Sequence, residues 1–96
     1  MQDYKNRGFV EIRYTVTAIE HREFWKQSGQ TSIMKKISKL LDDIAKHPET
    51  GIGKPEQLKH ELSGIWSRHI DKGNRLVYEI HSDHIIVLAM KGHYNL

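Results

Sequence analysis

The most restrictive feature of this sequence is a series of three strand-like segments joined only by tight turns. Residues 65–70 alternate apolar and polar side chains, and residues 75–81 repeat the pattern, which is typical of half-buried strands. Residues 84–90 are apolar on both faces, as in a central strand. The connections Lys72–Asn74 and Ser82–Asp83 suit hairpin loops, so the three strands are expected to be antiparallel neighbours.

Two helical segments precede these strands. Thr17–Glu20 reads as a capping box, in which a threonine and a glutamate satisfy each other's backbone amides, and Ser28-Gly29 ends the predicted helix. The second helix has a single apolar face from Ile33 to Ala45 and ends at His47-Pro48. Helices followed by a run of strands predict an α+β fold, with two N-terminal helices packed on one face of an antiparallel sheet.

The N-terminal segment adds one more strand. Apolar and polar residues alternate from Phe9 to Val16, whereas residues 1–8 are polar and read as a flexible N-terminal tail. We therefore expect a single domain over residues 9–96.

The two hairpin loops predict which residues pair across the sheet. A three-residue loop sets Ile70 opposite Leu76, and the tighter loop sets Ile80 opposite Ile85 and Leu76 opposite Ala89. One face of the sheet is then apolar and suits the helices, while the other is half charged and half apolar. That second face would carry Ser67, His69, Asp71, Arg75, Val77, Glu79, Ile86, Leu88 and Met90. Since solvent disfavours a contiguous apolar patch, something is expected to cover or bind it.

Composition narrows the function classes. The chain has 96 residues, 38% hydrophobic and 28% charged, which fits one small globular domain. It has no cysteine, so a disulfide, a cysteine ligand and a cysteine nucleophile are excluded. No apolar run approaches the roughly 20 residues that span a bilayer, and no signal segment opens the chain, so we expect a cytoplasmic protein without membrane contact. The net charge of +3 favours an anionic partner, although a plain surface excess would give the same value.

Basic, acidic and imidazole side chains gather around the predicted sheet. They are Lys54, Glu56, Lys59, His60, Arg68, His69, Arg75 and His93, with Tyr94 beside the last of them. Such a set could cleave RNA without a metal, because a carboxylate can take the 2′-hydroxyl proton, cations can hold the phosphate, and an imidazolium can protonate the leaving oxygen. Basic residues around a sheet are also commonplace. His60-Glu61 is half of a helical zinc motif but lacks the second histidine four residues after the first, so no metal or cofactor is expected.

A long central block carries a family resemblance. It reads Gly53-Lys54-Pro55-Glu56-Gln57-Leu58-Lys59-His60-Glu61-Leu62-Ser63-Gly64-Ile65-Trp66-Ser67-Arg68, and it is very similar to the corresponding block of the YoeB toxins. The similarity includes Ile33–Asp43, Asn74–Ile80 and Gly92–Tyr94, and it spans roughly residues 11–94. YoeB belongs to the RelE-like superfamily of bacterial toxin–antitoxin modules.

The resemblance implies a fold, a function and a set of residue roles. The fold would be RelE-like, with a small antiparallel sheet curled around two N-terminal helices. The protein would be a type II toxin that cuts mRNA in the ribosomal A site, bound by a YefM-like antitoxin and also able to form a homodimer. Glu56 matches the general base, Arg75 the phosphate-stabilising arginine and His93 the general acid. Tyr94 and Lys59 match residues that position the RNA.

Several residues keep two interpretations. Arg68 is a candidate RNA ligand, but it shares the core face of its strand, which equally suits a buried ion pair. His69 stands where relatives commonly have a second arginine, so an RNA contact there would depend on pH. Arg75 could instead pair with Asp71 at the end of the hairpin. Strict alternation would turn His93 away from the face of Arg75, but a kink at Gly92 would remove this objection.

The C-terminus departs from the family, because Asn95-Leu96 follow the His-Tyr pair at which relatives usually end. This departure, with His69, leaves a second class open: a non-catalytic relative that binds RNA or an antitoxin.

Overall fold

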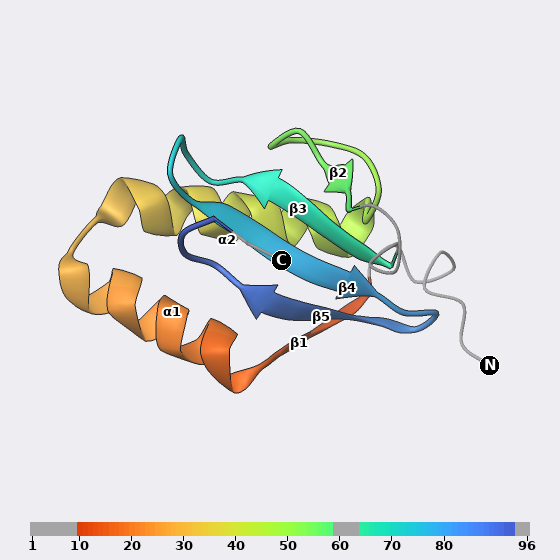
Figure 1. Ribbon diagram of the computed structural model, residues 1–96, viewed down its shortest axis with the longest axis horizontal. Coiled ribbons are helices and arrows are strands. Elements are labelled where there is room, and N and C mark those ends of the chain that lie inside the picture. The colour runs from red at the N-terminus through yellow and green to blue at the C-terminus, as the bar shows by residue number, and fades with distance from the viewer. Residues whose placement is uncertain (1–9, 59–63, 94–96) are drawn as a thin grey trace.

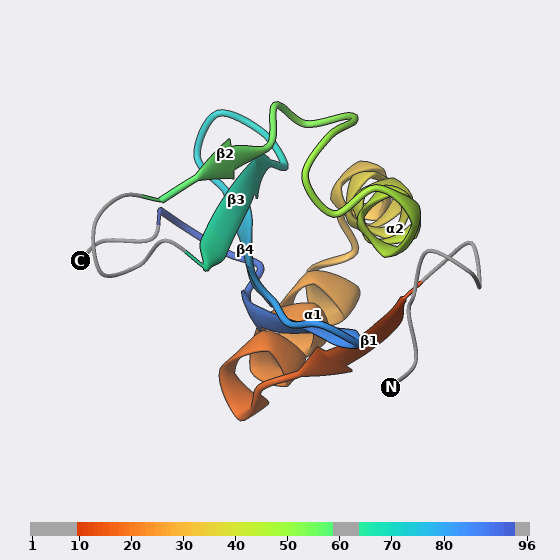
Figure 2. The same cartoon turned by 90° about the vertical axis from the view of Figure 1, so that its right-hand side faces the viewer.

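A computed structural model describes residues 10–58 and 64–93. In chain order its elements are β1 (Glu11–Tyr14), α1 (Val16–Ser28), α2 (Thr31–Lys46), β2 (Glu56–Gln57), β3 (Ile65–His69), β4 (Arg75–Ile80) and β5 (His84–Ala89). The strands form one sheet in the order β1-β5-β4-β3-β2. Both helices lie on one face of it, and the sheet curls around them (Figure 1, Figure 2). The predicted α+β class and its helix-on-sheet layering are confirmed.

One strand pair departs from the expected antiparallel pattern. β2 to β5 are antiparallel neighbours, but β1 runs parallel to β5, so the sheet is mixed. A parallel pair needs a long connection between its strands, and here the rest of the domain supplies it.

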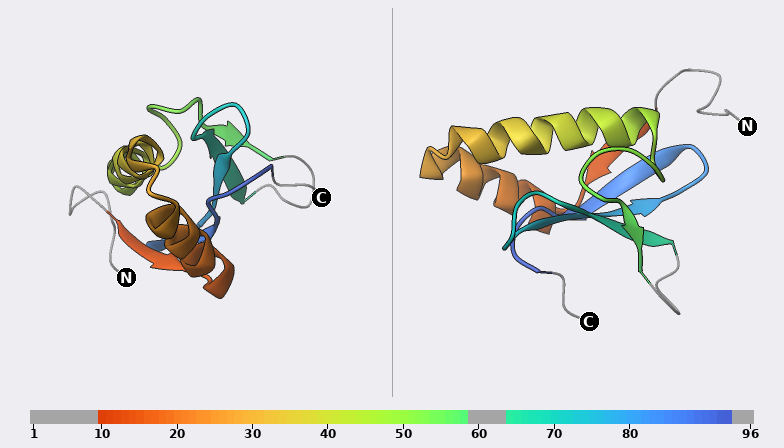
Figure 3. Two further views of the ribbon diagram at one scale, coloured as in Figure 1. Left: turned by 90° about the vertical axis from the view of Figure 1, so that its left-hand side faces the viewer. Right: turned by 90° about the horizontal axis from the view of Figure 1, so that it is seen from above.

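The helices form where the sequence predicted them, with one change at the first N-terminus. Thr15, and not Thr17, caps α1, since its Oγ accepts a hydrogen bond from the Ala18 amide at 3.0 Å. Helix α2 buries Ile37, Leu40 and Ile44 along its predicted apolar face. Figure 3 shows the two helices as one layer over the strands. Neither helix, within the described ranges, is long and apolar enough to cross a bilayer.

The turn between β3 and β4 lies one residue earlier than predicted. Arg68, not Ile70, lies opposite Leu76, and the Ile70 amide donates to the Asn74 carbonyl at 2.9 Å, which leaves residues 71–73 as the loop. The pairing register is therefore shifted by two residues. A shift of two residues preserves which face each side chain occupies, so the predicted faces of β3 and β4 still hold.

A bulge in β5 does change faces. Tyr78 pairs with Val87 as predicted, but Val77 pairs with Ala89 and not Leu76, because the register shifts between Val77 and Tyr78. Met90 consequently moves to the helix side, where it is fully buried in the main core. Its predicted place on the second face is wrong.

The core lies between the helices and the sheet. Its fully buried members include Leu40 and Ile44 of α2 and Leu76, Tyr78 and Ile85 of the sheet. A second, smaller cluster lies on the other face of the sheet. It consists of Ile65, Val77 and Ala89, with Leu58 and Leu88 packed against it. Part of the apolar patch predicted for that face is thus buried within the chain itself.

Candidate active site

The sheet face opposite the helices, here called the outer face, carries a row of paired residues. Glu56 of β2 lies opposite Ser67 of β3, Ser67 opposite Val77 of β4, and Val77 opposite Ala89 of β5. Directly paired residues share a face. β2, which the sequence pattern did not predict, therefore places the candidate base at the edge of this row. Lys54, two residues before it, has a left-handed backbone (φ 53°), which is uncommon for a side-chain-bearing residue and clusters at functional sites.

Arg75 reaches Glu56 across β3. Its Nη1 lies 3.7 Å from Glu56 Oε1, and the two side chains are 27% and 64% exposed. This separation makes an ion pair rather than a direct hydrogen bond. The alternative partner Asp71 is engaged elsewhere, since its Oδ1 accepts hydrogen bonds from the Gly73 amide and the Asn74 side chain. The geometry therefore sets a guanidinium beside the carboxylate of the candidate base.

His93 is connected to Arg75 through Gly92. The Arg75 amide donates to the Gly92 carbonyl at 3.0 Å, and the Gly92 amide donates to Asn74 Oδ1 at 2.8 Å. Gly92 has φ 73°, a left-handed conformation that a glycine adopts at little cost, and no atom crowds it. This kink after β5 allows His93, an exposed residue, to line a cavity on the outer face together with Val77. Glu56 and Arg75 are thus in contact on the outer face, and His93 lines a cavity that shares Val77 of that face.

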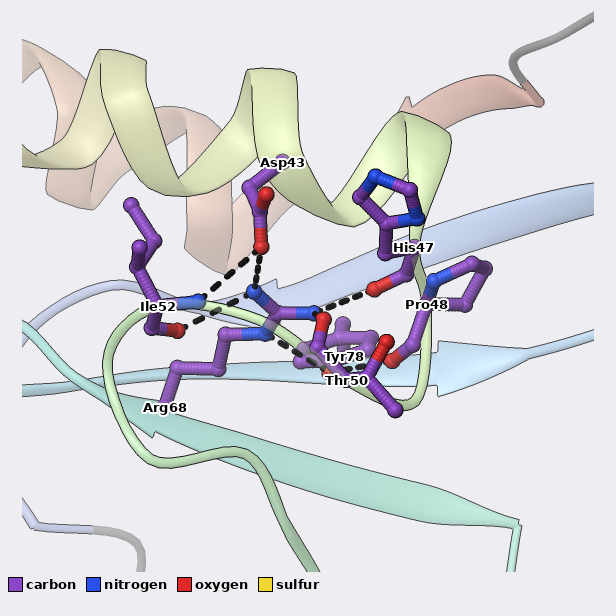
Figure 4. Close-up of polar contacts among 7 residues, drawn as sticks. All are labelled: Asp43, His47, Pro48, Thr50, Ile52, Arg68 and Tyr78. Carbon is purple, nitrogen blue, oxygen red and sulfur yellow. Dashed lines mark hydrogen bonds and ion pairs between the residues drawn. The ribbon is translucent and has the colours of Figure 1, made fainter.

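Arg68 is on the opposite, helix side of the sheet and is fully buried. Its guanidinium makes five hydrogen bonds (Figure 4). They join Nη1 to Asp43 Oδ2 at 2.6 Å and to Ile52 O at 3.1 Å, Nη2 to His47 O at 2.5 Å and to Thr50 O at 2.8 Å, and Nε to Tyr78 Oη at 3.1 Å. All five donors of the side chain are in use. The predicted RNA contact of Arg68 is therefore wrong, and the alternative of a buried ion pair holds.

Two pKa values reflect this buried network. Burial raises the pKa of Asp43, but the hydrogen bond from Arg68, the Ile52 amide and the Arg68 charge outweigh it and leave that pKa below its usual range. Burial raises the pKa of Tyr78, and the Arg68 hydrogen bond only partly opposes the shift. The Tyr78 hydroxyl donates to the Pro48 carbonyl at 2.6 Å. The network thus fastens residues 47–52, just before Glu56, to α2 and the sheet.

The other predicted site residues have mixed outcomes. His69 lies opposite Arg75 on the outer face, and its amide donates to the Gly53 carbonyl at 2.7 Å. Its RNA contact stays a prediction. Lys59 and Tyr94 lie outside the described residues, as do Asn95 and Leu96. No group of three or more histidine, aspartate or glutamate side chains in residues 10–58 and 64–93 could hold a metal ion.

His21 was not predicted to be near the site. It lies on α1 and lines the same cavity as His93, and its Nδ1 accepts a hydrogen bond from the Met90 amide at 3.0 Å. Burial, followed by the charge of Lys91, lowers its pKa. No sequence signal marks His21, because its contact with Met90 joins segments nearly the whole domain apart.

A curled sheet over two helices is the fold of small bacterial toxins such as the YoeB/ParE toxin from Agrobacterium tumefaciens, whose solved structure matches this chain with a TM-score of 0.79 at 31% identity and covers 88% of this chain and 99% of that one. The family model described as the YoeB-like toxin of bacterial type II toxin–antitoxin systems matches residues 14–94, and the chain belongs to this family.

Known relatives support the same assignment. Toxin YoeB of Streptomyces coelicolor is 40% identical over 85 residues, which cover 88% of this chain and 100% of the relative. The structure of the YoeB dimer from Staphylococcus aureus is 37% identical and has a TM-score of 0.78, covering 88% of this chain and 98% of that one. The heterotetrameric YoeB–YefM toxin–antitoxin complex from Staphylococcus aureus is also similar, with the same identity and coverage and a TM-score of 0.77.

Proposed function

We propose that this toxin is a ribosome-dependent endoribonuclease that cuts mRNA by metal-independent acid–base chemistry. The Glu56 carboxylate takes the proton of a 2′-hydroxyl, whose oxygen attacks the adjacent phosphorus. The Arg75 guanidinium stabilises the charge that grows on the phosphate, and protonated His93 gives its proton to the departing 5′-oxygen. The products are a 2′,3′-cyclic phosphate and a 5′-hydroxyl end. Translating ribosomes as the target would place the protein in the cytoplasm.

The observation that carries this proposal is the Glu56–Arg75 ion pair on the exposed outer face. The two side chains come from strands that are not neighbours, since β3 lies between β2 and β4. Their contact at 3.7 Å brings a proton acceptor and a phosphate ligand within one substrate's reach, and His93 lies beyond Arg75 through the Gly92 kink. Lys59 and Tyr94, which the family resemblance assigns to RNA positioning, belong to the same proposal.

Cleavage of mRNA on programmed ribosomes tests the assignment. Glu56→Gln and His93→Gln keep the size of each side chain but remove the base or the acid, so each should slow cleavage about 100-fold or more. Glu11→Gln is the matched control, because Glu11 is an exposed glutamate on β1 that pairs with Arg13. Cleavage at the wild-type rate by either site variant would contradict the roles. A wild-type protein that binds ribosomes without cutting would favour the non-catalytic alternative.

We further propose that a YefM-like antitoxin binds the outer face and that the chain can form a homodimer. The Staphylococcus aureus relatives are seen in both kinds of assembly. Ile86 and Leu88 remain half-exposed beside buried Val77, and the net charge of +3 suits an acidic, amphipathic segment that folds on binding.

A single charged substitution on the outer face tests whether the antitoxin binds there. Leu88→Glu should weaken antitoxin binding at least about tenfold, because it buries a carboxylate in an apolar contact. Ile19→Glu places the same charge on exposed α1 and should leave binding unchanged. An antitoxin that binds the helical surface alone would reverse this pattern.

A further inference from the structure

The cavity beside His93 has features that the catalytic residues do not explain. It is open to solvent on one side and has a volume of about 520 Å3, within the range of roughly 300–1,000 Å3 typical of small-ligand sites. Val77, Leu88 and Ala89 give it an apolar wall from the outer face. Thr17 and His21 of α1 give it a polar wall, and Lys91 adds a cation. An apolar wall that faces polar groups and a cation suits a nucleotide, whose base has apolar faces and whose sugar and phosphates are polar.

The start of α1 creates this cavity. β1 stops at Tyr14, and the first residues of the helix continue beside β5 in its place. The Thr15 amide donates to Val87 O and the Thr15 hydroxyl to Leu88 O, both at 3.1 Å. The bulge in β5 falls in the same stretch of the strand as these two hydrogen bonds. Leu88 and Ala89 are therefore held at the cavity wall, while Met90 turns into the core.

Two polar groups of the cavity, His21 and Lys91, are held by contacts within the chain. Because the Met90 amide donates to His21 Nδ1, the neutral ring carries its hydrogen on Nε2 and offers that nitrogen as a donor. The ammonium group of Lys91 lies 4.6 Å from the centre of the Phe24 ring, a cation–π contact that holds the cation on the α1 side. Phe24, an exposed residue, thereby contacts a residue that lines the cavity.

The chemistry fixes which nucleotide this cavity could receive. In-line displacement sets the attacking 2′-oxygen and the leaving 5′-oxygen on opposite sides of the phosphorus. The nucleotide before the cut therefore lies toward Glu56 at the β2 edge. The nucleotide after the cut lies toward His93, which protonates its 5′-oxygen and also lines the cavity.

We propose that the cavity between α1 and the end of β5 is the subsite for the nucleotide that follows the cut, and that Thr17, His21 and Lys91 contribute to its selection. This assignment rests on the proposed endoribonuclease function and adds a direction to it: the RNA runs 5′ to 3′ from the β2 edge toward α1.

The test is to map the 5′-hydroxyl ends that the protein produces on ribosomes carrying mRNAs randomised around the cut. Thr17→Phe fills the cavity from an exposed position and should slow cleavage about tenfold or more and change the preference for the first nucleotide after the cut. Val16→Phe adds the same ring at the neighbouring position, which is 72% exposed and outside the cavity, and should change neither. Lys91→Gln should slow cleavage several-fold, whereas Lys26→Gln at the exposed end of α1 should not.

The outcomes distinguish a failure of the subsite from a failure of the proposed endoribonuclease function. Suppose that cleavage depends on Glu56 and His93, but Thr17→Phe cleaves at the wild-type rate and with the wild-type preference for the nucleotide after the cut. This result would overturn the subsite alone. A changed preference only before the cut would overturn the proposed direction. If Thr17→Phe lost antitoxin binding but cleaved RNA normally, the cavity would be a binding site for a segment of the antitoxin and not for RNA. A wild-type protein that does not cut RNA would overturn the proposed function together with this subsite.

Discussion

Arg68 on β3 and Arg75 on β4 lie on adjacent strands, but they occupy opposite faces of the sheet. Arg68 is fully buried, and a carboxylate, a phenol and three carbonyls use all five of its donors. Arg75 is 27% exposed, and its ion pair with Glu56 spans 3.7 Å. A guanidinium with every donor engaged holds structure, whereas one with donors directed to an open face can bind a phosphate. The comparison separates a structural arginine from one whose guanidinium is open to a phosphate, which is the role that we propose for Arg75.

The largest expected difference between the two arginines is in stability. Arg68→Met leaves the Asp43 carboxylate and three carbonyls without their partner, and it should lower the free energy of unfolding by about 3–5 kcal/mol. Arg75→Met removes an ion pair that is screened by solvent and should lower it by about 1 kcal/mol or less. Urea unfolding of both variants measures the difference. Equal losses would show that the burial of Arg68 does not translate into stability.

A substitution at Gly51 can disturb the hydrogen-bond network of Arg68 without changing Arg68 itself. Its φ is 120°, and a Cβ at this position would overlap the Asp43 carboxylate. Gly51→Ala should therefore lower the free energy of unfolding by about 2–3 kcal/mol, through backbone strain and displacement of Asp43. Gly73→Ala is the control, because a Cβ added to Gly73 would meet no atom within 4 Å. A Gly51→Ala protein as stable as the control would mean that Asp43 can move without cost.

The charge of Asp43 should make this stabilisation depend on pH. Its pKa is lowered in the folded protein, so the unfolded chain binds protons more readily, with an aspartate pKa of about 3.9. The stabilisation is complete above that pH and is lost as pH falls through the lower folded value. The stability gap between the wild type and Asp43→Asn should thus narrow below about pH 4. Urea unfolding of both proteins between about pH 2 and pH 7 measures the gap, and a gap that stays constant down to about pH 2 would contradict the assignment.

Ser67 gives the smallest expected effect. It precedes Arg68 on the same strand but lies on the outer face, where it is 2% exposed and its Oγ has no hydrogen-bond partner among the described residues. Ser67→Ala removes an unsatisfied hydroxyl and should leave stability unchanged or raise it by up to about 1 kcal/mol. Thermal unfolding measures this, and a loss above about 1 kcal/mol would reveal a partner for the hydroxyl.

The sequence pattern predicted the faces of β3 and β4 correctly, because alternation depends only on local backbone geometry. It placed Arg68 on the core side but could not name its partners, since three of them are backbone carbonyls of a loop about 20 residues away. It misplaced Met90 because a bulge inserts one residue and reverses the alternation beyond it. β2 was missed because a two-residue edge strand has no periodicity to detect.

The candidate site also combines features that the sequence predicted with features that it could not predict. The roles proposed for Glu56, Arg75 and His93 rest on a family resemblance and not on local pattern. The structure brings Glu56 and Arg75 into contact. The left-handed backbone at Gly92, which places His93, was anticipated only as a kink that glycine permits. Nothing local in the sequence indicated that Thr17 and His21 would line the cavity beside His93, because α1 meets the end of β5 only in the folded chain.

The rate of mRNA cleavage by Arg75→Met on programmed ribosomes tests most directly whether the outer face performs the chemistry. We expect cleavage to fall at least about 100-fold while the urea unfolding curve stays close to that of the wild type, because Arg75 stabilises the transition state and little else. Arg13→Met, which removes an exposed arginine from β1, should cleave at the wild-type rate. Arg75→Met that cleaves as fast as the wild type would contradict the division between a structural and a chemical arginine.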